Sequence, residues 1–91
     1  MFSKEAFSER VKMLRISRNL SQVELAKIVG FSYSSAIGDI ERGRRTTPID
    51  KIVALADYFG VSVDYLIGRT DNPKLNKWLL NKYLAVFMII P

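Results

Sequence analysis

Hydrophobic positions recur at helical spacing along most of the chain, so the pattern predicts a series of short helices. The first helix is predicted over residues 4–19, where apolar residues three or four positions apart form one stripe and charged residues fill the opposite side. That stripe consists of Phe7, Val11, Leu14 and Ile16. Strand-like alternation is weak before the last twenty or so residues, so the fold class is predicted to be all-α.

Capping and stop signals place the next two helices. A second helix is predicted to begin after Ser21, because "SQVE" is a capping box in which the serine and the glutamate satisfy each other's backbone N–H groups. Gly30 is expected to end this helix. A third helix is predicted over residues 36–42, with Ser35 as its N-cap and Gly43 as its stop.

Two further helices follow in the second half of the chain. In "TTPID", Thr47 is expected to cap a fourth helix and Pro48 to occupy its first helical position. Gly60 is expected to end it, and Ser62 is expected to cap a fifth, very short helix, "VDYLI", before Gly68. The core residues predicted here are Ile52, Val53, Leu55, Ala56, Phe59, Val61, Val63, Tyr65 and Leu66.

Composition narrows the chemistry that is available. The 91 residues suffice for one small domain, and they include no cysteine and no histidine. Disulfides, the usual zinc sites and catalysis by histidine or cysteine are therefore excluded. Small helices leave little room for a cleft with paired carboxylates or an activated lysine. We therefore expect that the protein is not an enzyme and that it has no catalytic or metal-binding residues and no cofactor. Because "MFSKEAFSER" is not a signal-peptide pattern, we expect the protein to reside in the cytoplasm.

The distribution of charge matters more than its total. The chain has a formal net charge of +5, but residues 1–71 contribute only +2, from 11 Lys or Arg and 9 Asp or Glu. Three lysines in residues 72–91 supply the remainder. An anionic partner is therefore inferred from the local cluster of Arg42, Arg44 and Arg45 and not from the overall charge.

Three segments carry a family resemblance: "LSQVELAKIVGFS", "IGDIERGRR" and "LADYFGVSVDYLIG". In this order and spacing they resemble the phage-repressor or Cro-like helix–turn–helix DNA-binding family, the XRE-type transcriptional regulators. The resemblance covers residues 7–69. It implies a five-helix, lambda-repressor-like DNA-binding domain over residues 1–70, with the helix over residues 36–42 in the major groove of DNA.

The resemblance also implies which residues contact DNA. Gln22 matches a glutamine that contacts a phosphate, and the arginines after the third helix match a loop that runs along the phosphates. The full set of implied DNA contacts is Gln22, Tyr33, Ser34, Ser35, Gly38, Asp39, Arg42, Arg44 and Arg45. Arg15 and Glu41 match an ion pair beneath the DNA-facing surface. The sequence departs from the family in lacking the Gln, Asn, Arg or Lys that reads bases bidentately from the recognition helix.

The third predicted helix has an unusually bare outer face of Ala36, Gly38 and Asp39. Small residues would let its backbone approach base edges and phosphates. Asp39 either accepts from a cytosine amino group or pairs with Arg42 three positions along the helix. Tyr33 either packs beneath the turn or stacks against the DNA backbone.

Residues 71–91 form an apolar tail that begins within the turn-rich "GRTDNP" of residues 68–73. The tail is predicted as an additional C-terminal helix starting near Asn72 and Pro73, although "YLAVFMII" also permits a strand, and it is too short to cross a bilayer. It is a dimer contact, a membrane-surface anchor or part of a longer protein. Dimerisation is favoured because domains of this kind bind two half-sites. The expected contact residues are Leu75, Trp78, Leu79, Tyr83, Val86, Phe87 and Ile90.

The combined hypothesis is a sequence-specific regulator of transcription that binds double-stranded DNA. We expect a repressor that binds a palindromic operator as a homodimer. The alternative is a protein-interaction module of the same fold with an antitoxin-like or anti-repressor role, favoured by the plain recognition helix and the apolar tail. Alanine at Arg44 and Arg45 separates the two, because a module that binds only a protein partner would be indifferent to the change.

Overall fold

The computed structural model describes residues 2–44 and 47–74. Five helices occupy these residues: α1 (Lys4–Ser17), α2 (Gln22–Val29), α3 (Ala36–Glu41), α4 (Ile49–Phe59) and α5 (Val63–Leu66). No strand occurs in these two ranges, so the predicted all-α class is confirmed. No helix within the described part of the chain is long and apolar enough to cross a membrane.

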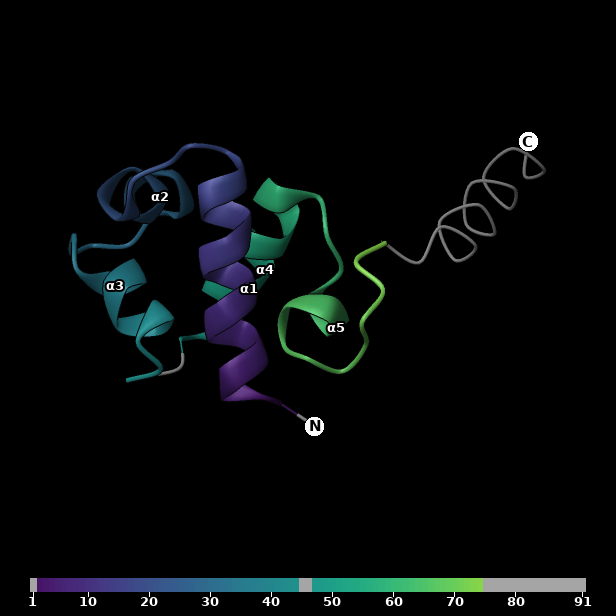
Figure 1. The fold of residues 1–91 in the computed structure, drawn as a ribbon. Helices are drawn as coiled ribbons and strands as arrows, with labels where there is room; N and C mark the ends of the chain where they lie inside the picture. Colours follow the sequence, from purple (N-terminus) through teal and green to yellow (C-terminus); the bar gives the residue numbers. More distant parts are fainter. Residues whose placement is uncertain (1, 45–46, 75–91) are drawn as a thin grey trace, which may run out of the picture.

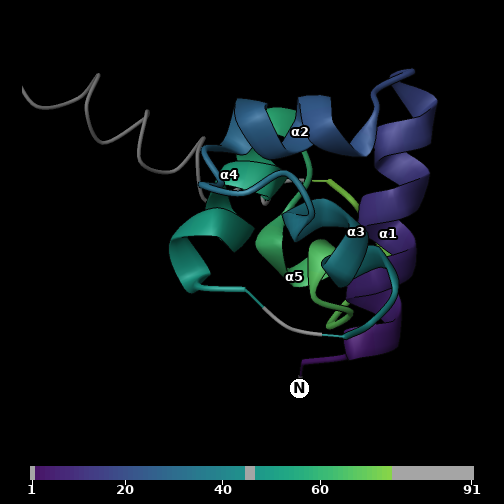
Figure 2. The same cartoon turned by 90° about the vertical axis from the view of Figure 1, so that its left-hand side faces the viewer.

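The helices pack around α1, which lies between the two halves of the domain (Figure 1). On one side α1 packs against α3, and on the other it packs against α5. The second helix packs against both α3 and α4, and α4 packs against α5. Figure 2 shows the face on which α2 and α3 lie next to each other, with the loop to α4 leaving the end of α3.

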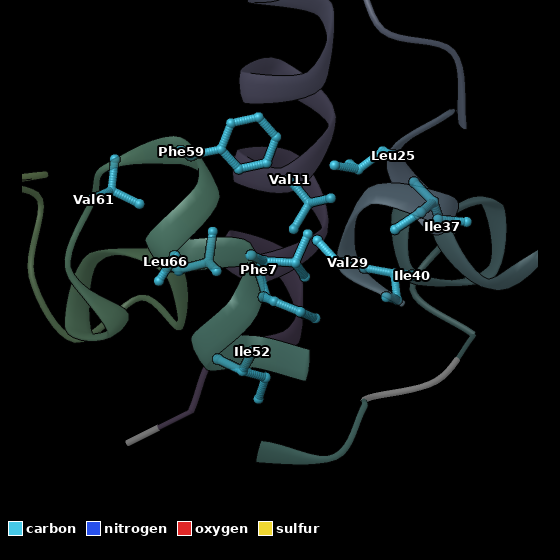
Figure 3. Close-up of a cluster of buried hydrophobic side chains, with 13 residues drawn as sticks. Phe7, Val11, Leu25, Val29, Ile37, Ile40, Ile52, Phe59, Val61 and Leu66 are labelled. Atoms are coloured by element: carbon cyan, nitrogen blue, oxygen red, sulfur yellow. The ribbon is translucent and has the colours of Figure 1, made fainter. Parts of the chain in front are cut away.

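All five helices, together with Val61 of the α4–α5 connection, contribute to one hydrophobic core (Figure 3). None of these five described helices is long enough to be stable in water alone, so burial of these side chains holds them in place. The core consists of Phe7, Val11, Leu25, Ala26, Val29, Ile37, Ile40, Ile52, Leu55, Ala56, Phe59, Val61 and Leu66.

Several predicted helix ends are confirmed. In the capping box of α2, the Ser21 hydroxyl accepts the Glu24 N–H at 3.0 Å, and the Glu24 carboxylate accepts the Ser21 N–H at 3.0 Å. Gly30 ends α2 in the left-handed region, with φ of +84°, where a side chain would be strained. The Ser62 hydroxyl accepts the Tyr65 N–H at 3.0 Å and so caps α5.

The start of α4 differs from the prediction. Pro48 has extended backbone angles, φ −56° and ψ 151°, and is itself the N-cap, so the helix begins at Ile49. Because Pro48 is not helical, Thr47 lies one position before the cap. The Thr47 hydroxyl oxygen is buried and has no hydrogen-bond partner among the described residues. The prediction of Thr47 as the cap and Pro48 as the first helical residue is therefore wrong.

The predicted core stripes were too wide at their edges. Successive helical residues are rotated by about 100°, so Val53 turns away from the stripe that contains Ile52, and Ile16 lies about 140° from Val11. Ile16 is 53% exposed and Val53 is 40% exposed, so the prediction that they are buried is wrong. Other predicted core residues only pack partly buried against the cluster, namely Leu14, Val63 and Tyr65.

Two arginines, Arg10 within α1 and Arg18 at its C-cap, hold the second half of the domain. Arg10 donates to two backbone oxygens of the segment that contains α5 and pairs with Asp71, with 2.8 Å between Nη2 and Oδ1. Arg18 donates to the backbone oxygens of Tyr58 at 3.0 Å and Phe59 at 3.1 Å, at the end of α4. These cations therefore stabilise the fold, which explains why total charge says little about the interface.

The chain after α5 returns to the domain before the described part ends. The Ser62 N–H donates to the Pro73 carbonyl oxygen at 3.0 Å, and Asn72 Oδ1 accepts the Lys74 N–H at 3.1 Å. The predicted start of the tail helix near Asn72 and Pro73 is wrong, because residues 72–74 are not helical. The rest of that helix and its expected dimer contacts lie outside the described residues, namely Leu75, Trp78, Leu79, Tyr83, Val86, Phe87 and Ile90.

Candidate nucleic-acid interface

The α2–α3 unit is held rigidly by its inner side. Ala26 of α2 is buried, and its carbonyl oxygen accepts the Phe31 N–H at 2.9 Å in the turn between the helices. Ile37 and Ile40 of α3 are 0% and 1% exposed, so the inner face of α3 is anchored in the core. The orientation of the outer side of α3 is thereby fixed. A surface that binds a rigid partner requires such a fixed orientation.

The N-terminal end of α3 presents short polar side chains. Ser34 and Ser35 are exposed, and Ser35 occupies the N-cap position without a capping bond from its side chain. Tyr33 is 38% exposed, and its ring lies edge-on to that of Phe31, with 6.2 Å between the centroids. Tyr33 is therefore a surface residue, and the interpretation that it packs in the core is wrong.

The bare outer face predicted for α3 is only partly correct. Ala36 is 0% exposed and belongs to the inner side, and Gly38 is also buried. The side chains of Gln22 and Arg42 cover Gly38: a Cβ built at this glycine would lie 3.1 Å from Gln22 Oε1 and 3.2 Å from Arg42 Nη2. The expectation that Gly38 is an open point of approach for the DNA backbone is therefore wrong for this structure.

Asp39 lies beside Arg42 on the outer side of α3. Their closest atoms, Arg42 Nη2 and Asp39 Oδ1, are 3.3 Å apart. Of the two roles weighed for Asp39, local pairing with Arg42 is the one present here. The pair also reduces the repulsion that a lone carboxylate would exert on a polyanion.

Arg15, Glu41 and Gln22 form a network beneath this surface. Arg15 donates to both carboxylate oxygens of Glu41, with 2.7 Å from Nε to Oε2 and 3.0 Å from Nη2 to Oε1. Gln22 Nε2 donates to the same Oε1 at 3.1 Å. The hydrogen bond with Glu41 raises the pKa of Arg15 above its ordinary value. Arg15 and Glu41 are thus an enclosed ion pair, with side chains 14% and 4% exposed.

The loop after α3 carries the exposed cations. Arg42 and Arg44 are both exposed, and the Arg44 N–H donates to the Asp39 carbonyl oxygen at 3.0 Å, which fixes the start of the loop against α3. Arg45, the third member of the predicted cluster, lies outside the described residues. The described loop therefore adds further positive charge next to the surface formed by Gln22 and Arg42.

A groove of about 480 Å³ lies between the α2–α3 turn and the start of α4. Among the described residues that line it, the one cation is Lys51. Sequence reasoning missed Lys51, because the residues around it come from a segment twenty positions earlier. Lys51 Nζ lies 5.8 Å from the centre of the Phe31 ring and 3.9 Å from Asp50 Oδ2. The groove is lined by Gly30, Phe31, Ser32, Tyr33, Ile40, Thr47, Pro48 and Lys51.

The chemistry of this surface is that of hydrogen bonding and charge. Its described members offer hydroxyl, amide and guanidinium groups. These groups donate hydrogen bonds that phosphate oxygens and base edges can accept. Within residues 2–44 and 47–74, no three Asp, Glu, His or Cys side chains are grouped closely enough to hold a metal ion.

Comparison with known proteins agrees with this geometry. Residues 11–66 match the family model Helix-turn-helix (HTH_3). The chain is 36% identical over 80 residues to the uncharacterized HTH-type transcriptional regulator YobD of Bacillus subtilis, covering 86% of this chain and 70% of that protein. It is 35% identical over 61 residues to the immunity repressor protein of Bacillus phage phi105, covering 67% of this chain and 42% of that protein. The crystal structure of the restriction-modification controller protein C.AhdI from Aeromonas hydrophila is similar, with a TM-score of 0.61, 32% identity and coverage of 69% and 94% of the two chains.

Proposed function

The chain belongs to the Helix-turn-helix (HTH_3) family of XRE-type transcriptional regulators, and on that premise we propose that it binds double-stranded DNA with α3 in the major groove. Proteins of this family are regulators and not enzymes. The proposed role is that of a repressor that binds a palindromic operator as a dimer. The similarity to a phage immunity repressor supports repression over activation.

The placement of Gln22 and Arg42 carries the proposal. They come from α2 and from the end of α3, yet their polar ends meet over Gly38. A phosphate contact from each would fix the position of α3 relative to the DNA backbone, because such contacts set register and orientation. Arg44 adds positive charge beside them, and from the sequence we expect Arg45 to contact phosphates as well.

Base reading would come from the exposed hydroxyls of Ser34 and Ser35, which suit either a donor or an acceptor on a base edge. Asp39 would accept from a cytosine amino group only after giving up Arg42, so reading by Asp39 and phosphate binding by Arg42 are coupled. With few long side chains on α3, part of the specificity would come from the shape and deformability of the operator.

Dimerisation through residues 71–91 is proposed from the two half-sites that such operators contain. Removal of residues from Leu75 onward, followed by measurement of molar mass in solution by light scattering, tests it. The full chain should have the mass of a dimer and the shortened chain that of a monomer. A shortened chain that remains dimeric would assign the dimer contact to the helical domain.

Selection of bound fragments from a pool of random duplex DNA tests the function as a whole. The proposal predicts enrichment of a motif with two-fold symmetry and half-site centres about 34–36 Å apart, one helical turn. Enrichment of an asymmetric motif would remove the palindromic operator but leave DNA binding. Failure to retain any duplex would favour the protein-interaction role, in which alanine at Arg44 changes nothing.

A further inference from the structure

Gly38 lies in the middle of α3, where glycine is the least favourable residue apart from proline. Its backbone is within the ordinary helical range, since the positive-φ glycines of the described chain are Gly30, Gly43, Gly60 and Gly68. Backbone conformation therefore gives no reason for glycine at position 38. Its burial also means that the bare helix face is not open to an approaching molecule in this structure.

The space that a Cβ would fill at Gly38 is taken by two side chains. A Cβ at this position would lie 3.1 Å from Gln22 Oε1 and 3.2 and 3.3 Å from the two terminal nitrogens of Arg42. These separations are tighter than nine in ten of the contacts that real Cβ atoms make, so the neighbouring atoms would have to move by a few tenths of an ångström. Alanine would therefore displace the polar ends of both side chains.

Both side chains are also held from the side. Gln22 Nε2 donates to Glu41 Oε1 at 3.1 Å, and Glu41 is in turn fixed by its ion pair with Arg15. Arg42 Nη2 lies 3.3 Å from Asp39 Oδ1. Each side chain thus has a carboxylate partner and lies next to Gly38 before any ligand arrives.

We propose that Gly38 is a positioning residue whose missing Cβ forms a seat for Gln22 and Arg42. The inference rests on the proposed binding of DNA, and it assigns Gly38 a role through these two side chains in place of direct contact with DNA. Ordering long side chains on binding is unfavourable, so side chains that are already seated bind phosphates more tightly. The seat thereby increases affinity without adding a contact.

The variant Gly38→Ala tests the seat. Its fold should be at least as stable as that of the parent chain, because alanine is the better helix former and the displaced atoms are the ends of flexible side chains. Its affinity for duplex DNA should fall about tenfold. The slope of log affinity against log salt should stay unchanged, since no cation has been removed. A variant that binds DNA as tightly as the parent chain would overturn the inference.

The matched control is the same substitution in a chain that already carries Gln22→Ala and Arg42→Ala. With the seat empty, adding Gly38→Ala should change the affinity by less than about twofold, because the effect acts through those side chains. A tenfold loss in this background as well would mean that Gly38 contacts DNA directly, and the seat would be rejected.

A measurement without DNA separates this inference from the proposed function. Gln22 is the only glutamine in the chain, so its side-chain amide gives one assignable pair of NMR signals. In the parent chain these signals should differ from those of a free glutamine, and Gly38→Ala should shift them. Signals that do not move would overturn the seat even if DNA binds, and signals that move in a chain that ignores DNA would refute only the proposed function.

Discussion

Gln22 donates its side-chain amide to Glu41, with 3.1 Å between Nε2 and Oε1. The same oxygen accepts from Arg15 Nη2 at 3.0 Å, so residues from α1, α2 and α3 meet at one carboxylate whose side chain is 4% exposed. The proposed phosphate contact of Gln22 is therefore tied to the ion pair that locks the helices together. Stability and DNA binding share this carboxylate.

Loss of the Glu41 charge should destabilise the fold strongly. Glu41→Gln leaves the Arg15 guanidinium largely enclosed without its anion, so the free energy of unfolding should fall by about 3 kcal/mol. Urea unfolding measures the change. Glu9→Gln, at an exposed position on α1, is the matched control and should cost less than about 0.5 kcal/mol. Equal stability of the two variants would show that Arg15 and Glu41 contribute nothing as a pair.

Loss of a loop arginine should weaken binding to every duplex alike. Arg42→Ala and Arg44→Ala should each reduce the slope of log affinity against log salt by about 0.9, since each removes one phosphate contact. Fluorescence anisotropy at several salt concentrations measures the slope. Arg69→Ala removes a 58%-exposed arginine beyond α5 and should leave the slope unchanged. If all three variants behave alike, the loop does not lie on the phosphates.

Loss of Arg18 should lower the stability of the fold without affecting DNA binding. Its guanidinium lies 5.1 Å from the centre of the Tyr58 ring and 5.4 Å from that of Phe59, and it donates to the carbonyl oxygens of both residues. Arg18→Ala should therefore lower the free energy of unfolding by about 1 kcal/mol, which thermal unfolding measures. Lys12→Ala, at an exposed position within α1, is the control. An unchanged melting temperature for Arg18→Ala would contradict the role of Arg18 as a clamp on α4.

The capping box of α2 should make stability depend on acidity. The backbone and side-chain hydrogen bonds from Ser21 lower the pKa of Glu24 below its ordinary value of 4.5. An acid with a lowered pKa stabilises the fold above its ordinary pKa, and this contribution disappears as the pH falls through the lowered value. The parent chain should therefore be more stable than Glu24→Gln near neutral pH, and thermal unfolding should show this advantage shrinking below pH 4.5. An advantage that is constant with pH would show that the carboxylate charge is not what caps the helix.

Elements governed by near neighbours in the sequence were predictable. Ser21, Gly30 and Ser62 act within three or four residues of themselves, so their patterns identify the ends of α2 and the start of α5. Thr47 and Val53 were misjudged because their positions depend on how Pro48 enters α4 and on which side of α4 meets the core. A shift of the start of α4 by one residue decides whether Thr47 is the cap, and a rotation of α4 by one residue decides whether Val53 is buried.

The candidate site was predictable only as a set of residues. The helix–turn–helix motif predicts Gln22, Gly38 and Arg42 as site residues. It does not predict that the side chains of Gln22 and Arg42 cover Gly38. That arrangement needs α2 and α3 to cross at one particular place, which packing of Ala26 and Ile37 determines and no local pattern records. Lys51 was missed for the same reason.

Titration of the purified chain into fluorescent random-sequence duplex DNA at about 50 mM salt tests DNA binding most directly. We expect half-saturation near or below about 1 µM, and a loss of affinity with salt that corresponds to about three phosphate contacts per chain. Anisotropy that stays flat across the titration, in a chain shown by circular dichroism to be helical, would contradict it.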